Sequence, residues 1–160
     1  MKIFRNSTWI KWLVGAFFII IIILLVTTMK QKEENTLNDP LEWIQSSCPQ
    51  SPNCVSTMLP EVDKHFISPL PFKINFQHSK QVILDILKED AAIKNIELQE
   101  KLIYVQYIIP VFGFVDDVVF YFDQNTKEIH FRSASRIGYW DLGVNRRRMK
   151  KITKRYLNWN

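Results

Sequence analysis

A run of uncharged residues, 12–29, constrains this chain more than any other feature of its sequence. Within it, residues 13–26 are one glycine and otherwise apolar. Eighteen helical residues span about 27 Å, close to the ~30 Å hydrocarbon core of a bilayer. Trp9 and Trp12 lie where aromatic side chains anchor a helix at the membrane interface. The run therefore predicts a transmembrane helix within residues 1–29.

A cleaved signal peptide is the alternative interpretation of this segment. Its apolar region is usually about 7–15 residues long and ends in small residues, whereas Thr27-Thr28 is the only small-residue candidate near the end of this run. Three basic residues precede the apolar run, and the two lysines that follow it are accompanied by two glutamates. The positive-inside rule then favours a cytoplasmic N-terminus. We expect a single-pass membrane protein whose C-terminal domain is periplasmic or extracellular.

The 160 residues leave room for one ordinary domain after the anchor. We expect a polar tether at 30–44 and a single domain at 45–160. With 47% hydrophobic residues, wholesale disorder is excluded. The net charge of +5 is concentrated at the C-terminus, where residues 144–160 hold seven Lys or Arg and no acid. Three interpretations stay open for this basic end: a solvated helix face, a surface for anionic lipid head groups, or a nucleic-acid patch, which membrane anchoring disfavours.

The hydrophobic pattern of residues 45–160 predicts an α+β fold. Helical spacing predicts a helix at 80–90 capped by Ser79 and a final helix at 145–157 capped by Asn145. Alternation and turn residues predict strands at 72–77, 93–99, 102–109, 118–122 and 128–133, the last two joined as a hairpin. This order predicts one small two-layer domain, an antiparallel sheet with helices on one face.

Cys48 and Cys54 enclose a short loop within the proline- and serine-rich segment 48–60. An exported domain lies in an oxidising compartment, so we expect the two cysteines to form a disulfide. Free thiols and a redox or metal site are the alternatives. Redox motifs separate their cysteines by two residues rather than five, and the three histidines are far from each other in the sequence. We expect no bound metal and no cofactor.

The segment 132–148 carries the densest mixture of arginine, acid, amide and aromatic residues. Arginines there offer forked donors to a phosphate or carboxylate, and a capped helix N-terminus favours an anion. Two adjacent carboxylates precede the segment, although neighbours on a strand point to opposite faces. The candidate ligand-binding residues are Asp116, Asp117, Arg132, Arg136, Asp141, Asn145 and Arg146. In the alternative interpretation the arginines pair with the aspartates inside the protein and only orient the loop.

Four motifs follow one another along the chain: CPQSPNCVS at 48–56, GFVDD at 113–117, RSASR at 132–136 and GYWDLGVNRRR at 138–148. In this combination and order they resemble the domain of unknown function 1499 family, over about residues 45–157. The resemblance implies a small bacterial or plastid domain, often attached to a membrane, without an assigned activity.

We therefore expect a membrane-anchored domain of the cell envelope that binds an anionic ligand, anionic lipid head groups or a protein partner. Catalysis is the less favoured interpretation, and the sequence identifies no catalytic residue. An enzyme would be a hydrolase or transferase of anionic substrates that uses Asp116 or Asp117 as its base. A purely structural envelope protein is the third interpretation.

Overall fold

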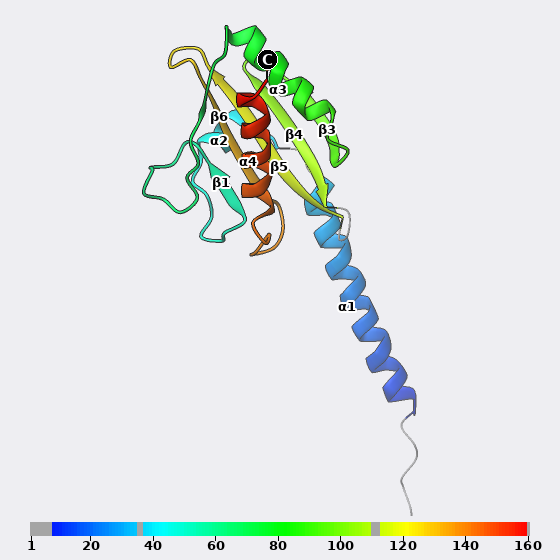
Figure 1. Ribbon diagram of the computed structural model, residues 1–160. Helices are drawn as coiled ribbons and strands as arrows, with labels where there is room; N and C mark the ends of the chain where they lie inside the picture. Colours follow the sequence, from blue (N-terminus) through cyan, green and yellow to red (C-terminus); the bar gives the residue numbers. More distant parts are fainter. Residues whose placement is uncertain (1–7, 35–36, 110–112, 160) are drawn as a thin grey trace, which may run out of the picture. The chain divides into compact units, whose positions relative to one another are not determined.

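The structure is a computed structural model that describes residues 8–34, 37–109 and 113–159 (Figure 1). It divides into two compact units, of which the first contains helix α1 and the second begins at Leu37. α1 comprises Thr8–Glu34, so residues 12–29 are helical as predicted, and the helix continues through the first five residues of the expected tether. Its described side chains are largely exposed, Trp12 by 80%.

Among the residues that the structure describes, no helix is both long enough and apolar enough to span a membrane. The transmembrane role of α1 therefore stays a prediction.

The second unit is built on one antiparallel sheet with strand order β1-β6-β5-β4-β3. Four strands form a meander, and two short strands lie end to end along the outer edge of β6. Their bounds are β1 Cys54–Ser56, β2 Leu70–Pro71, β3 Ile93–Leu98, β4 Leu102–Ile109, β5 Phe114–Asp123 and β6 Glu128–Ser135. The sheet confirms the predicted α+β class.

Helices cover both faces of this sheet. α3 (Phe76–Lys88) and α4 (Val144–Leu157) pack on one face, where their apolar stripes meet alternate residues of β4, β5 and β6 (Figure 1). α2 (Pro40–Gln45) packs on the other face, where Ile44 meets Tyr104 and Val119. The prediction of helices on one face is thus right for α3 and α4 and wrong for α2. The central strands are apolar on both faces, so the second face also needs a cover.

Three predictions in the region before the meander are wrong. Residues 72–77, all described, contain no strand: the short strand β2 lies just before them at Leu70–Pro71, and α3 begins at Phe76. The cap of α3 is Asn75, whose side chain accepts the His78 amide, while the buried Ser79 hydroxyl accepts the Lys73 amide. The expected loop at 48–60 also contains β1, because its backbone pairs with β6.

The meander agrees closely with the sequence pattern. β4 has the predicted bounds, and the turn at residues 124–127 closes the β5–β6 hairpin. β5 begins four residues earlier than predicted, at Phe114. Asp116 and Asp117 therefore lie inside a strand rather than before it.

Candidate functional site

The two adjacent carboxylates of β5 lie on opposite faces of the sheet. Asp116 is opposite Ser135 and Asp117 is opposite Ala134 in the β5–β6 register. Both aspartates are buried. Because side chains alternate along a strand, Asp116 faces α4 and Asp117 faces the side covered by α2. The seven predicted site residues are thereby separated into different groups.

On the α2 face, Asp117 and Arg136 form a closed ion pair. Arg136 donates from Nε to Asp117 Oδ2 at 2.8 Å and from Nη2 to Oδ1 at 2.9 Å. The Tyr104 hydroxyl donates to the same Oδ1 at 2.7 Å. Burial lowers the pKa of Arg136, but the hydrogen bond and charge of Asp117 outweigh burial and raise it overall. Burial, with the hydrogen bond and charge of Asp117, raises the pKa of Tyr104 to about 12.

Arg132 lies on the same face and joins α2 to the sheet. Its Nη1 donates to the carbonyls of Trp43 and Ser46 at 2.6 and 2.7 Å, and its Nη2 donates to the Ser47 carbonyl. The guanidinium lies 4.4 Å from the centre of the Trp43 ring. Burial lowers the pKa of Arg132 to about 10, so the side chain stays charged at neutral pH. These contacts describe an arginine used for packing rather than one presented to a ligand.

On the α4 face, Asp116 pairs with an arginine that the sequence did not single out. Arg148 Nη2 donates to Asp116 Oδ2 at 2.6 Å, and the guanidinium lies 4.2 Å from the centre of the Tyr107 ring. Arg148 Nη1 also donates to Asn145 Oδ1 at 2.7 Å, which in turn accepts the Ser133 hydroxyl at 2.5 Å. Asn145 is 1% exposed and is the centre of this network.

The start of α4 is capped differently from the prediction. The N-cap position is Gly143, with φ +75°, and Asn145 lies inside the first turn. Asp141 supplies the acceptors, since Oδ1 accepts the Gly143 amide and Oδ2 accepts the Asn145 amide, both at 2.8 Å. The position at which we expected a bound anion is thus occupied by the protein's own carboxylate.

Arg146 contacts another part of the chain. Its Nη1 donates to the Phe66 carbonyl at 3.0 Å and its Nη2 to the Lys64 carbonyl at 2.6 Å. The residue ties α4 to the loop that follows β1.

The cysteine motif supports the same network. Cys48 and Cys54 form a disulfide, as predicted, with their Cα atoms 5.8 Å apart. Within the closed loop, Asn53 donates from Nδ2 to the Gly138 carbonyl at 2.7 Å and accepts Asn145 Nδ2 at its own carbonyl at 3.1 Å. The first and fourth sequence motifs therefore meet in space.

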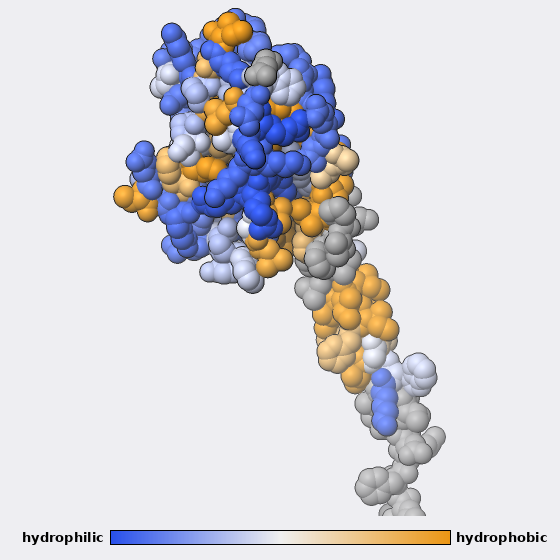
Figure 2. Space-filling model, in the orientation of Figure 1, coloured by the Kyte–Doolittle hydropathy of each residue, from blue (hydrophilic) through white to orange (hydrophobic). Residues whose placement is uncertain are grey.

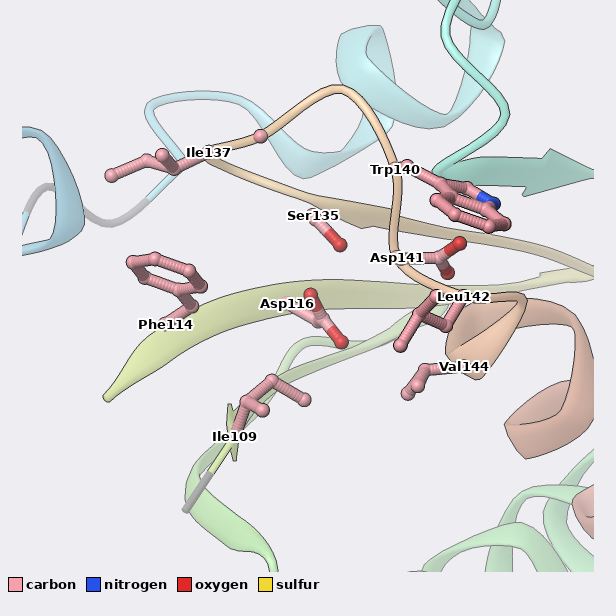
Figure 3. Close-up of a pocket in the computed structure, with 10 residues that line it drawn as sticks. Ile109, Phe114, Asp116, Ser135, Ile137, Trp140, Asp141, Leu142 and Val144 are labelled. Atoms are coloured by element: carbon pink, nitrogen blue, oxygen red, sulfur yellow. The ribbon is translucent and has the colours of Figure 1, made fainter. Parts of the chain in front are cut away.

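A cavity of about 180 Å³ lies beside this network (Figure 3). Asp116 and Ser135 project into it from the sheet, and Asp141 from the loop that leads to α4. The other walls are apolar. They are formed by Ile109, Phe114, Ile137, Gly138, Trp140, Leu142 and Val144. We call this space, defined by the ten residues just named, the loop cavity.

Two of the predicted site residues, Asp116 and Asp141, line the loop cavity, and Asn145 bonds to Asp141 behind it. Asp117, Arg132 and Arg136 lie on the opposite face. Within the part of the chain that the structure describes, no group of three or more His, Cys, Asp or Glu is placed to hold a metal ion. The sequence pattern does not predict the apolar wall, because isolated apolar residues in a polar loop carry no periodic signal.

The motifs that build this network lie within a region that matches a known protein family. The model of the family described as "Protein of unknown function (DUF1499)" matches residues 45–155. The chain belongs to this family. The match extends from the end of α2 through most of α4, so it covers the whole sheet and the loop cavity. No curated protein matches the chain, and no solved structure matches it.

Proposed function

We propose that this protein is a membrane-anchored domain of the cell envelope that binds an anionic ligand or partner beside α4. The observation that carries the proposal is the charge of the outer face of α4. Arg147, Lys150, Lys151 and Lys154 are exposed there, and the helix contains no acid. Among the described residues, none of these four takes part in an ion pair. Figure 2 shows the resulting hydrophilic surface along α4, with apolar surface at its lower end.

Membrane anchoring is supported by the surface of α1. The described side chains from Trp12 to Leu24 are apolar and mostly exposed. A helix with an apolar surface on all sides requires an apolar environment. The Cys48–Cys54 disulfide supports export of the second unit, since such bonds persist in oxidising compartments. We propose residues 12–29 as the span, with the N-terminus in the cytoplasm.

An enzyme with an aspartate base has less support. A general base needs a carboxylate with a free lone pair directed at the substrate. Both oxygens of Asp117 accept hydrogen bonds from Arg136, and Asp116 is held by Arg148. We therefore favour binding over catalysis.

Two fusions test the orientation. Alkaline phosphatase fused to the C-terminus should be active, whereas a fluorescent protein that folds only in the cytoplasm should stay dark there. Fluorescence without phosphatase activity would refute the proposed topology. An identical pair of fusions placed at the N-terminus serves as the reciprocal control.

Anion binding is tested with the full-length protein in nanodiscs of zwitterionic phosphatidylcholine. Inorganic phosphate should raise the melting temperature saturably relative to chloride at equal ionic strength. The double variant Arg147→Gln/Lys151→Gln should lose this response. Lys94→Gln/Lys101→Gln, which neutralises two exposed lysines outside α4, should retain it. An unchanged response in the first double variant would refute binding at α4.

A further inference from the structure

A second hollow borders the loop cavity. The second space, about 300 Å³, shares Ile109 and Val144 with the loop cavity, so the two are neighbours along one wall. It is otherwise lined by Asp90, Ala92, Tyr107, Ile108, Arg147, Arg148 and Lys151. We call it the basic hollow. The volumes together fall within the ~300–1,000 Å³ typical of small-molecule sites.

The loop cavity is suited to an apolar group. Its polar atoms are largely engaged, since Asp116 accepts Arg148 and Asp141 accepts the amides of Gly143 and Asn145. The surface left for a ligand comes mainly from aliphatic and aromatic side chains. At its rim, Trp140 is 69% exposed and Leu142 is 64% exposed. A ligand that covers them removes apolar surface from water, which favours binding.

The basic hollow is suited to an anion. Arg147 and Lys151 are one turn apart on the exposed side of α4, and Asp90 is the one acid in the lining. Arg148 also lines it but is neutralised by Asp116. Arg147 donates from Nη1 to the Leu142 carbonyl at 2.6 Å, and neither Arg147 nor Lys151 forms an ion pair among the described residues. Their two positive charges therefore outnumber the one carboxylate.

Tyr107, which lines the same hollow, is 1% exposed, and its hydroxyl has no hydrogen-bond partner among the described residues. Burial, together with the charge of Asp90, raises the pKa of Tyr107, so the hydroxyl keeps its proton and can donate. Buried polar groups without partners are rare and call for a ligand or water oxygen.

From these neighbouring surfaces we infer that the ligand is an anionic amphiphile. Its apolar chain lies in the loop cavity against Trp140 and Leu142, and its anionic head lies in the basic hollow near Arg147, Lys151 and the Tyr107 hydroxyl. The inference rests on the proposed function and specifies the chemical class of its ligand. A membrane lipid with an anionic head and a soluble anionic amphiphile share this chemistry.

The test compares three probes on the full-length protein in phosphatidylcholine nanodiscs: hexyl phosphate, inorganic phosphate and hexanol. Tryptophan fluorescence reports binding, and Trp140→Phe identifies the reporter. Hexyl phosphate should bind at least tenfold more tightly than either other probe. Leu142→Asn should reduce hexyl phosphate affinity to that of inorganic phosphate, because Asn tolerates the positive φ of residue 142 and removes only the apolar contact. Leu157→Asn, at the far end of α4, is the matched control and should have no effect.

The head-group half of the site is tested separately. Tyr107→Phe should weaken hexyl phosphate and inorganic phosphate several-fold while leaving hexanol unchanged. Equal affinities for hexyl and inorganic phosphate would overturn the amphiphile inference and leave the proposed anion site intact. Failure of both phosphates to bind would remove the proposed function as well.

A final arm distinguishes the sources of the ligand. Phosphatidylglycerol in the nanodisc competes with hexyl phosphate if the site takes membrane lipid. Phosphatidylglycerol that leaves hexyl phosphate affinity unchanged assigns the site to a soluble amphiphile.

Discussion

Asp116 and Asp117 are neighbours in β5, yet each binds a different arginine on a different face of the sheet. Asp117 accepts two hydrogen bonds from Arg136 on the α2 face, and Asp116 accepts one from Arg148 on the α4 face. Strand β5 therefore holds the segment that follows β6 through Asp117 on one face, and it holds helix α4 through Asp116 on the other face. The sequence segment from β6 to α4, which borders the loop cavity, is held at both ends by these pairs.

Replacement of Arg136 by alanine should lower the free energy of unfolding by about 3–5 kcal/mol, because it leaves the buried Asp117 carboxylate without its cation. Urea unfolding of the full-length protein measures the change. Lys150→Ala, at an exposed basic residue of α4 that forms no ion pair among the described residues, should stay within about 0.5 kcal/mol of wild type. A loss below about 1 kcal/mol at Arg136 would mean that water solvates the leftover carboxylate, as at an exposed pair.

Alkaline pH should destabilise the α2 face through Tyr104. The pKa of Tyr104 is raised from 10.0 to about 12 in the folded protein, so the fold favours the protonated hydroxyl. Its contribution is fully present below pH 10 and is lost as the pH rises from 10 to about 12. Tyr104→Phe should therefore lose less stability over this window than wild type. Urea midpoints at pH 9 and pH 11 give the comparison, and equal losses in the two proteins would contradict it.

The hydrophobic pattern predicts most of the fold because it records which residues face the core. β4 and the stripe of α3 follow directly from it. The same pattern contains the missed partner of Asp116. Met149 and Ile152 are apolar at helical spacing and lie on the buried side of the last helix. Arg148 precedes Ile152 by one turn, so it also faces the sheet. Arg146 lies on another side of the helix.

Other features depend on contacts between distant segments. Asn75 and Ser79 are both good capping residues, and tertiary context uses the first as the cap and buries the second. The position of α2 depends on Arg132, whose donors reach carbonyls more than eighty residues earlier in the chain. Contacts between such distant segments leave no periodic signal, so they cannot be predicted from the hydrophobic pattern of a single sequence.

Loss of the disulfide should destabilise the protein by about 2.4 kcal/mol, the chain-entropy value for a loop of this size. The double variant Cys48→Ser/Cys54→Ser removes the bond, and urea unfolding measures the loss. Wild-type protein treated with alkylating reagent without reductant should show neither cysteine labelled by mass spectrometry. Quantitative labelling of both would contradict the bond.

Asn145 should be the most sensitive single position of the α4 network. Its Nδ2 donates to the Asn53 carbonyl, the Ser135 hydroxyl and Asp141 Oδ2 at 2.9–3.1 Å, and its Oδ1 accepts Ser133 and Arg148. Asn145→Ala should cost about 3 kcal/mol, because it leaves several buried polar groups unpaired at about 1–3 kcal/mol each.

Asn145→Asp separates the roles of the two ends of this side chain. The aspartate keeps the acceptor for Arg148 but loses the donors, and it places a second carboxylate within hydrogen-bond distance of Asp141. It should therefore be at least as destabilising as Asn145→Ala at neutral pH. Asn125→Ala, at an exposed turn, is the matched control and should stay within about 0.5 kcal/mol of wild type.

Hydrogen exchange in the Asn145 variants should show faster amides at Gly143 and Asn145 and in the Cys48–Cys54 loop, because Asn145 joins these segments. Faster exchange confined to α4, with the disulfide loop unchanged, would show that the loop does not depend on Asn145.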